Sequence, residues 1–345
     1  MKNKPGEIAF TVLAIILYLS FFIFYAAAHM HPGQNQIMIF SHIALALVGS
    51  LLVLRWSSSF SVRLLSGLAY VLLPLLFVTQ WQEPINGASR WIFLLGVSFQ
   101  PSEFLKLCMP CLLCSQRFYK TRAGHILLLA SFYLTMIQPD LGTALYLLAI
   151  SLFTLYGNHL SIQRLMLLIA STFLAIYAGF GYLLPHQKFR LLSWANPEIY
   201  SIGDLYQVNA SITTFFNSSS LSVEECYELF FGIHTDFAWT LLACSFGVLI
   251  TCIVFALVVM TKFFICATGF KRMNIVTVRL AVAIFAGNIS ISCYSFLMAL
   301  GKVPITGFQP PLIGYGGSGY IVSVLSLSLA TKILYESSNF KLKLI

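Results

Sequence analysis

The chain contains many long apolar runs, and several of them reach the length that crosses a lipid bilayer as an α-helix. A spanning helix needs roughly 17–25 mostly apolar residues. The runs cover residues 8–28, 36–54, 62–79, 102–116, 124–138, 141–157, 162–183, 236–261, 276–300 and 313–334. They lack the alternation of a strand, and lipid permits only helices or closed barrels. We therefore predict an all-α, polytopic integral membrane protein with about ten transmembrane helices.

The composition excludes an ordinary soluble domain, because only 9% of the residues are charged where about 25% is typical. The first run ends in Ala26-Ala27-Ala28, which resembles a signal-peptide cleavage site. That run is longer than the roughly 7–15 residues of a signal core, so we expect it to be retained. Residues 1–345 are predicted to form a single membrane domain.

Charge distribution predicts the orientation. With ten helices and both termini cytoplasmic, most Lys and Arg residues fall on the cytoplasmic side, as the positive-inside rule requires. The acidic residues mostly fall on the other side, and a long extracytoplasmic loop, about 184–234, separates helices 7 and 8. The net charge of +9 then reflects topology and lipid headgroups, and no nucleic-acid partner is needed to explain it.

The cysteines predict neither a metal site nor an extracytoplasmic disulfide. Cys108, Cys111 and Cys114 recur every three residues without a nearby histidine, as small buried apolar residues do. Of the eight cysteines, only Cys226 is placed in an outer loop. We therefore expect no disulfide on that side.

Ionisable residues at membrane depth are the informative ones, because burial without a partner is costly. In "NGASRWIFLLGVSFQPSEFLKL", Arg90 precedes a predicted helix whose first turns carry Glu103 and Lys106 on one face. In "IQPDLGTAL", Asp140 begins another helix. Lys106 is the cation that this topology places in the outer half of a helix. We therefore predict a Lys106–Asp140 bridge with Glu103 nearby.

Two further stretches lie at the same predicted end. The prolines and glycines of "GKVPITGFQPPLIGYGGSGY" argue against a continuous helix, and broken backbone at this depth lines a cavity or packs on protein. In "FFGIHTDFAW", Asp236 precedes a long apolar run. Thr235 or Asp236 could be a helix N-cap, or Asp236 could be a functional carboxylate, and His234 could orient it or close the loop.

These motifs appear in the order seen in the SEDS family of bacterial cell-wall polymerases (FtsW, RodA, SpoVE), which the chain resembles from about residue 85 to 320. They are "NGASRWI", "FQPSEFLKL", "QPDLGTA", "YQ", "HTDF" and "PITGFQPPLIGYGGSG". The resemblance implies a peptidoglycan glycosyltransferase in the bacterial cytoplasmic (inner) membrane, which polymerises lipid II at the outer face for division or elongation. Asp236 is the implied catalytic residue. The implied substrate-binding residues are Arg90, Glu103, Lys106, Asp140, Gln207, His234, Thr235 and Ser318.

The implied reaction inverts the anomeric carbon, so one base suffices to deprotonate the acceptor hydroxyl. The available cations for the diphosphate leaving group are Arg90, Lys106, Lys188, Arg190 and Lys302. A divalent cation, Mg or Mn, could share this task, so Asp236 is either base or metal ligand. The resemblance also implies a class B penicillin-binding protein as partner.

The chain departs from the family pattern at Cys244-Ser245, where similar members carry two glutamates, and in "VNASITTFFNSSS", which lacks the usual glycines. The missing glutamates keep open a non-catalytic scaffold of the cell-wall synthesis complex, and ten spans with a broken helix near Gly316 keep open a lipid II flippase or transporter. Acids crowded at one membrane face, rather than at its middle, favour the enzyme over a transporter.

Overall fold

The computed structural model describes residues 36–82, 89–94, 97–115, 117–138, 140–157, 163, 185–195, 204–217, 225–226, 233–270 and 275–339. The helices are α2 (Gln36–Arg55), α3 (Ser58–Val78), α4 (Pro101–Leu113), α5 (Arg122–Ile137), α6 (Leu141–Tyr156), α8 (Pro185–Ala195), α9 (Asp204–Phe216), α11 (Ala238–Phe246), α12 (Val248–Phe270), α13 (Val276–Ala299) and α14 (Gly317–Asn339), with a 3-10 turn at Thr79–Trp81. An antiparallel hairpin, β1 (Ile92–Leu94) and β2 (Val97–Phe99), precedes α4. The sequence analysis does not anticipate this hairpin.

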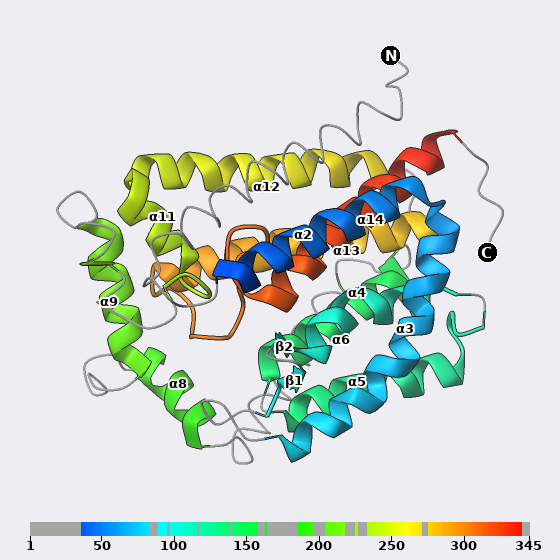
Figure 1. Cartoon of the computed structure of the whole chain (residues 1–345), viewed down its shortest axis with the longest axis horizontal. Coiled ribbons are helices and arrows are strands. Elements are labelled where there is room, and N and C mark those ends of the chain that lie inside the picture. The colour runs from blue at the N-terminus through cyan, green and yellow to red at the C-terminus, as the bar shows by residue number, and fades with distance from the viewer. Residues whose placement is uncertain are drawn as a thin grey trace.

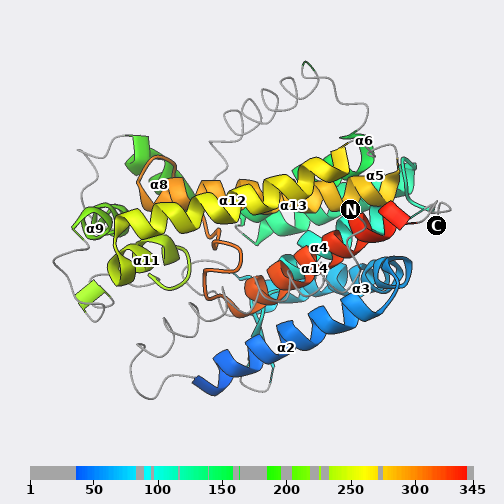
Figure 2. The same ribbon diagram turned by 90° about the horizontal axis from the view of Figure 1, so that it is seen from above.

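The helices form one bundle in which α13 and α14 are central (Figure 1). Helix α13 packs against α6, α12 and α14, and α14 packs against α2 and α4. On the opposite side of the bundle, α3 packs against α4, and α5 packs against α6. The shorter helices α8, α9 and α11 lie together at one end of the bundle in both ribbon views (Figure 2).

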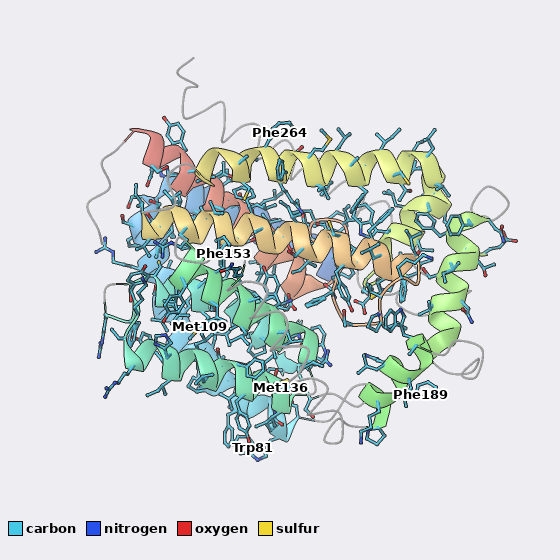
Figure 3. The ribbon with its side chains drawn as sticks, turned by 180° about the vertical axis from the view of Figure 1, so that it is seen from behind. Trp81, Met109, Met136, Phe153, Phe189 and Phe264 are labelled. Carbon is cyan, nitrogen blue, oxygen red and sulfur yellow. A yellow bond between two sulfur atoms is a disulfide. The ribbon has the colours of Figure 1, made fainter. Side chains whose placement is uncertain are left out.

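The outward faces of the long helices are apolar. Phe264 on α12 points away from the bundle, whereas Met109 on α4 lies inside it (Figure 3). Four helical segments of the described part are long and apolar enough to cross a membrane: Ser58–Trp81, Val248–Ala267, Val276–Ala299 and Gly317–Ser337. Shorter apolar helices cover Ile39–Arg55, Arg122–Ile137 and Leu141–Tyr156.

Most predicted helices coincide with observed ones within a few residues. Those at 8–28 and 162–183, with much of the loop at 184–234, lie outside the described residues. The single helix predicted at 236–261 is wrong, because the chain breaks at Gly247 between α11 and α12. Gly247 has φ of +86°, a backbone conformation that a side chain disfavours and that ends the helix.

The end of α14 joins the corner between α2 and α3. Lys332 Nζ donates to the Leu54 carbonyl at 2.9 Å, in the last turn of α2. Glu336 Oε2 accepts from the Ser58 backbone N–H at 3.0 Å, in the first turn of α3. Lys332 and Glu336 also pair at 3.4 Å. Each charge therefore meets helix-end groups of opposite partial charge.

Candidate active site

The polar motifs converge at the end of the bundle where α4, α6, α11 and α14 begin. Asp236 lies in the turn 233–237, which precedes α11. The N-cap of α11 is Phe237, with no side-chain capping bond. The possibility that Thr235 or Asp236 caps this helix is therefore wrong, and the carboxylate needs another explanation.

The turn 233–237 is fixed against the segment 301–316, which leads into α14. The Tyr315 N–H donates to the His234 carbonyl at 2.8 Å. A Cβ on Gly314 would lie 2.7 Å from the Thr235 carbonyl oxygen and 2.9 Å from Pro310 Cδ. Only a glycine allows this approach without displacement, so the two motifs form one backbone unit.

Asp236 is half-buried, and loss of hydration raises its pKa to about 6. The positive charges of Arg190 and then Arg90 oppose this rise in pKa, and the negative charges of Glu103 and Asp140 add to it. The turn is therefore the place where charges from four other segments meet. Burial lowers the pKa of His234 to about 4, so His234 is neutral at pH 7 and can orient a group without adding charge.

Arg90 is the cation beside Asp140, at 3.7 Å from Nη1 to Oδ2. The predicted Lys106–Asp140 bridge is wrong, because Lys106 instead pairs with Glu103 at 2.5 Å on the same helix. Arg90 also donates from Nε to the Gln138 carbonyl at 3.2 Å. Asp140 in turn accepts from the Thr143 N–H at 3.2 Å and caps α6. Arg90 is therefore held by the corner between α5 and α6.

Lys106 lies between two aromatic rings, 5.6 Å from the centre of Tyr146 and 5.5 Å from that of Phe308. Such contacts stabilise a cation that has little water around it. A cavity of about 40 Å³ lies beside the Glu103–Lys106 pair. Its polar lining includes Glu103, Lys106, Tyr146, Asn288, Gln309 and Ser326.

The backbone at the start of α14 packs closely against the Gln309 side chain. A Cβ on Gly316 would lie 1.8 Å from Gln309 Oε1, and one on Gly319 would lie 2.8 Å from the same atom. Ser318 is buried and its Oγ accepts from the Gln100 N–H at 3.1 Å. The predicted binding residue Ser318 therefore joins the starts of α4 and α14 in this structure.

Five of the predicted substrate-binding residues lie in the surroundings of Asp236 in the structure: Arg90, Glu103, Asp140, His234 and Thr235. Gln207 lies on α9, but its side chain is outside the described part. Arg190 on α8 is absent from the predicted binding residues, although its charge is the strongest that lowers the pKa of Asp236. Arg190 lies in the long predicted loop, so no helical spacing in the sequence indicates that it approaches Asp236.

Comparisons with known proteins identify the family of the chain. The FtsW/RodA/SpoVE cell cycle protein model matches residues 7–339. A protein of Moranella endobia named probable peptidoglycan glycosyltransferase FtsW is 29% identical, over 88% of this chain and 84% of the relative. A protein of the same name from Borreliella burgdorferi is 26% identical, over 94% of this chain and 93% of the relative.

Two solved structures share the fold. A chain from a peptidoglycan synthase complex that coordinates polymerization and crosslinking has a TM-score of 0.72 at 24% identity, over 94% of this chain and 96% of that one. The rod shape determining protein RodA of Thermus thermophilus has a TM-score of 0.62 at 21% identity, over 94% and 95%. With a family match over nearly its whole length, the chain belongs to the FtsW/RodA/SpoVE family of cell cycle proteins.

Proposed function

We propose that this protein is a peptidoglycan glycosyltransferase that polymerises lipid II, with Asp236 as the general base. The relatives that carry this activity in their names align with most of the chain. The observation that carries the proposal is the environment of Asp236. It is a carboxylate outside any helix, with a pKa raised to about 6 and with Arg90 and Arg190 near enough to act on it.

This environment suits an inverting displacement. The acceptor sugar's 4-hydroxyl oxygen attacks the anomeric carbon of the donor, and the bond from that carbon to the diphosphate oxygen breaks. The hydroxyl proton passes to the Asp236 carboxylate, and the diphosphate leaves with the bonding electron pair. A base whose pKa lies near the working pH is largely ionised there, and it still binds the transferred proton well enough to assist the reaction. Arg90 and Arg190 are the cations placed to stabilise the charge on the leaving diphosphate.

The cavity beside Lys106 is lined by Glu103, Lys106 and residues of α6, α13 and α14, and Asp236, Arg90 and Arg190 are not part of that lining. We therefore place the reacting groups over the turn 233–237, where Arg90, Arg190 and Asp236 meet. Lys106 and Tyr146 both line the cavity. Lys106 then supports the site through Glu103 rather than through Asp140.

A divalent cation does not fit the donors near Asp236. In the described part, no group of three or more His, Cys, Asp or Glu side chains could hold a metal ion. Glu103 and Asp140 are each paired with a cation. We therefore derive no step through Mg or Mn, and a chelator arm in the experiment below measures any dependence on either metal.

We place the site on the outer face of the bacterial cytoplasmic membrane, with a class B penicillin-binding protein as partner. Cys244 of the Cys226–Cys244 disulfide lies on α11, the helix that directly follows the turn carrying Asp236. Disulfides persist in oxidising compartments outside the cytoplasm, which supports this orientation. The partner is supported by the shared fold with a chain from a complex that coordinates polymerization and crosslinking.

The decisive experiment compares the purified full chain with its Asp236→Asn variant in elongation of lipid II, with the transpeptidase partner present. Loss of the base should lower the rate by about 10²–10⁴-fold while the melting temperature stays unchanged. Glu225→Gln serves as a charge-matched control, because Glu225 is exposed and lies outside the turn 233–237. Parallel reactions contain EDTA, with and without added Mg or Mn.

Full elongation by Asp236→Asn would refute the role of this residue. Movement of labelled lipid II across liposome membranes, unaffected by Asp236→Asn and without polymer, would instead select the transporter alternative. A folded wild-type chain that neither polymerises nor transports, yet still binds the transpeptidase, would select the scaffold.

A further inference from the structure

A disulfide between Cys226 and Cys244 encloses the turn that carries Asp236. The two cysteines are 18 residues apart in sequence, and their Cα atoms are 6.7 Å apart. Both are buried, Cys226 completely and Cys244 to all but 7%. The covalent ring they close contains the whole turn 233–237 and most of α11. The sequence analysis expects no disulfide on this side of the membrane, so this bond corrects it.

Helix α11 needs such an anchor because it is short and is not continuous with the next helix. It has 9 residues and ends at Gly247, where the positive φ separates it from α12. A helix of about two turns is not stable by its own backbone bonds, so its packing sets its position. Tertiary contacts must therefore hold α11.

Those contacts hold the beginning of α11 by hydrogen bonds and its end by the disulfide. Trp239 Nε1 donates to Ser295 Oγ on α13 at 3.0 Å. The hydroxyls of Thr240 and Ser211 are 2.6 Å apart, and Ser211 also donates to the Ala299 carbonyl at 3.0 Å. In the last turn, the Ser245 hydroxyl bonds only within α11, to the Leu241 carbonyl, whereas the Cys244 sulfur crosses to another segment.

Backbone hydrogen bonds connect α11 directly to the turn 233–237. The Phe237 carbonyl accepts from the N–H of Thr240 at 2.8 Å and from that of Leu241 at 3.2 Å. The turn is therefore the first part of the helical hydrogen-bond pattern. Asp236 is adjacent to this carbonyl, so a shift of α11 displaces the carboxylate.

We propose that the Cys226–Cys244 disulfide is a positioning element for Asp236, fixing α11 so that the turn 233–237 presents the carboxylate to the acceptor hydroxyl. This inference rests on the proposed glycosyltransferase function. The two cysteines are positioning residues and take no part in the sugar chemistry. Opening the bond by a dithiol transfers two electrons and two protons to the cysteine sulfurs, while the dithiol becomes a cyclic disulfide.

The test measures lipid II elongation by the full chain with its transpeptidase partner, for the wild type, Cys226→Ser, Cys244→Ser and the double variant. We expect kcat to fall by about 10–100-fold in all three variants, because a displacement of the order of 1 Å costs this much. The double variant should match either single variant, because each removes the same bond. Cys252→Ser is the matched control, since Cys252 is an exposed free cysteine on α12.

A second measurement separates positioning from mere stability. Freed from the bond, the turn opens to water, so the pKa of Asp236 should fall from about 6 towards its ordinary value. The acidic limb of the kcat/KM profile should then move to lower pH in the serine variants, whereas a loss of folded protein alone leaves the profile in place. The groups facing Asp236 are Arg190, Arg90, Glu103 and Asp140, with His234 and Tyr315 on the adjoining backbone.

Serine variants that elongate at the wild-type rate would overturn the proposal, as would thiol labelling that finds both cysteines free in active wild-type protein. If the variants do not fold, the wild type is reduced with dithiothreitol and reoxidised. Loss and recovery of kcat support the proposal, and an unchanged rate in protein with both thiols labelled refutes it. A wild type that makes no polymer in either state refutes the proposed function instead.

Discussion

Asp236 is surrounded by charges whose effects on its pKa oppose each other. Burial and the carboxylates of Glu103 and Asp140 raise that pKa, and Arg190 and Arg90 lower it. Each of these neighbours comes from a different segment: α4, the start of α6, α8 and the stretch before β1. The affinity of Asp236 for a proton therefore depends on how accurately these four segments meet.

This balance predicts a pH dependence at the residue scale. The carboxylate acts as a base only when ionised, so kcat/KM for lipid II elongation should fall about tenfold per pH unit below pH 6 and level off above it.

Arg190→Gln removes a charge that lowers the pKa of Asp236, so the midpoint of the kcat/KM profile should rise. Glu103→Gln removes a charge that raises it, so the midpoint should fall. A profile that stays flat down to about pH 4.5, well below the cited pKa, would contradict the assignment.

The charged residues show where the sequence is informative and where it is not. The i, i+3 spacing places Glu103 and Lys106 on one helix face, and they pair there. The predicted topology assigns Asp140 to Lys106, because it places Lys106 in the outer half of a helix and Arg90 in a loop. The hairpin of β1 and β2, whose strands have only 3 residues each, precedes α4 and follows Arg90, which lies beside Asp140 instead.

At the scale of elements, the segment 301–316 acts as a rigid support for the turn 233–237. Gly314 matters because the Thr235 backbone carbonyl occupies the space that a side chain would need. The backbone bond from Tyr315 to His234 then aligns the two motifs. Asp236 is therefore positioned by contact between two irregular segments as well as by α11.

Gly314→Ala should separate these segments. The new methyl group would lie 2.7 Å from the Thr235 carbonyl oxygen, so the turn must move, and we expect lipid II elongation to fall by about tenfold or more. Gly67→Ala is the control, because nothing lies within 4 Å of its added carbon. Equal activity of the two variants in the elongation assay would show that the contact does not position the base.

Helix positions follow from the sequence because the apolar runs are long, and α2, α3, α5, α6 and α13 begin and end within a few residues of the predicted bounds. The break at Gly247 does not follow, because one glycine in an apolar run is common within a helix. The Cys226–Cys244 bond is missed for the same reason. A continuous helix from residue 236 places Cys244 deep in lipid, whereas the break leaves it on the short α11.

At the scale of the molecule, the two ends of the bundle differ in chemistry. One end carries the irregular segments and the convergent charges around Asp236. The other end carries helix-capping cations, among them Arg279, which is buried and donates to the Leu155 carbonyl at 3.0 Å. The apolar faces between the ends, on α3, α5 and α12, are exposed and suit contact with lipid or with a partner's helix.

The proposed partner should therefore associate through its membrane-spanning helix. Helices in lipid associate by packing, so the full chain should co-purify with a complete class B penicillin-binding protein and lose most of this association when the partner's span is deleted. An unrelated single-span protein provides the control. Undiminished co-purification of the deleted form would place the main contact outside the membrane.

Helix α14 begins at the site with Ser318 and ends at the α2–α3 corner with Glu336. As one rod of about 35 Å, it connects the candidate site to the opposite end of the bundle. A fluorescent protein or affinity tag fused close to Glu336 would disturb the contacts that fix this end of α14. Reporter fusions for imaging should be checked for retained polymer synthesis before their localisation is interpreted.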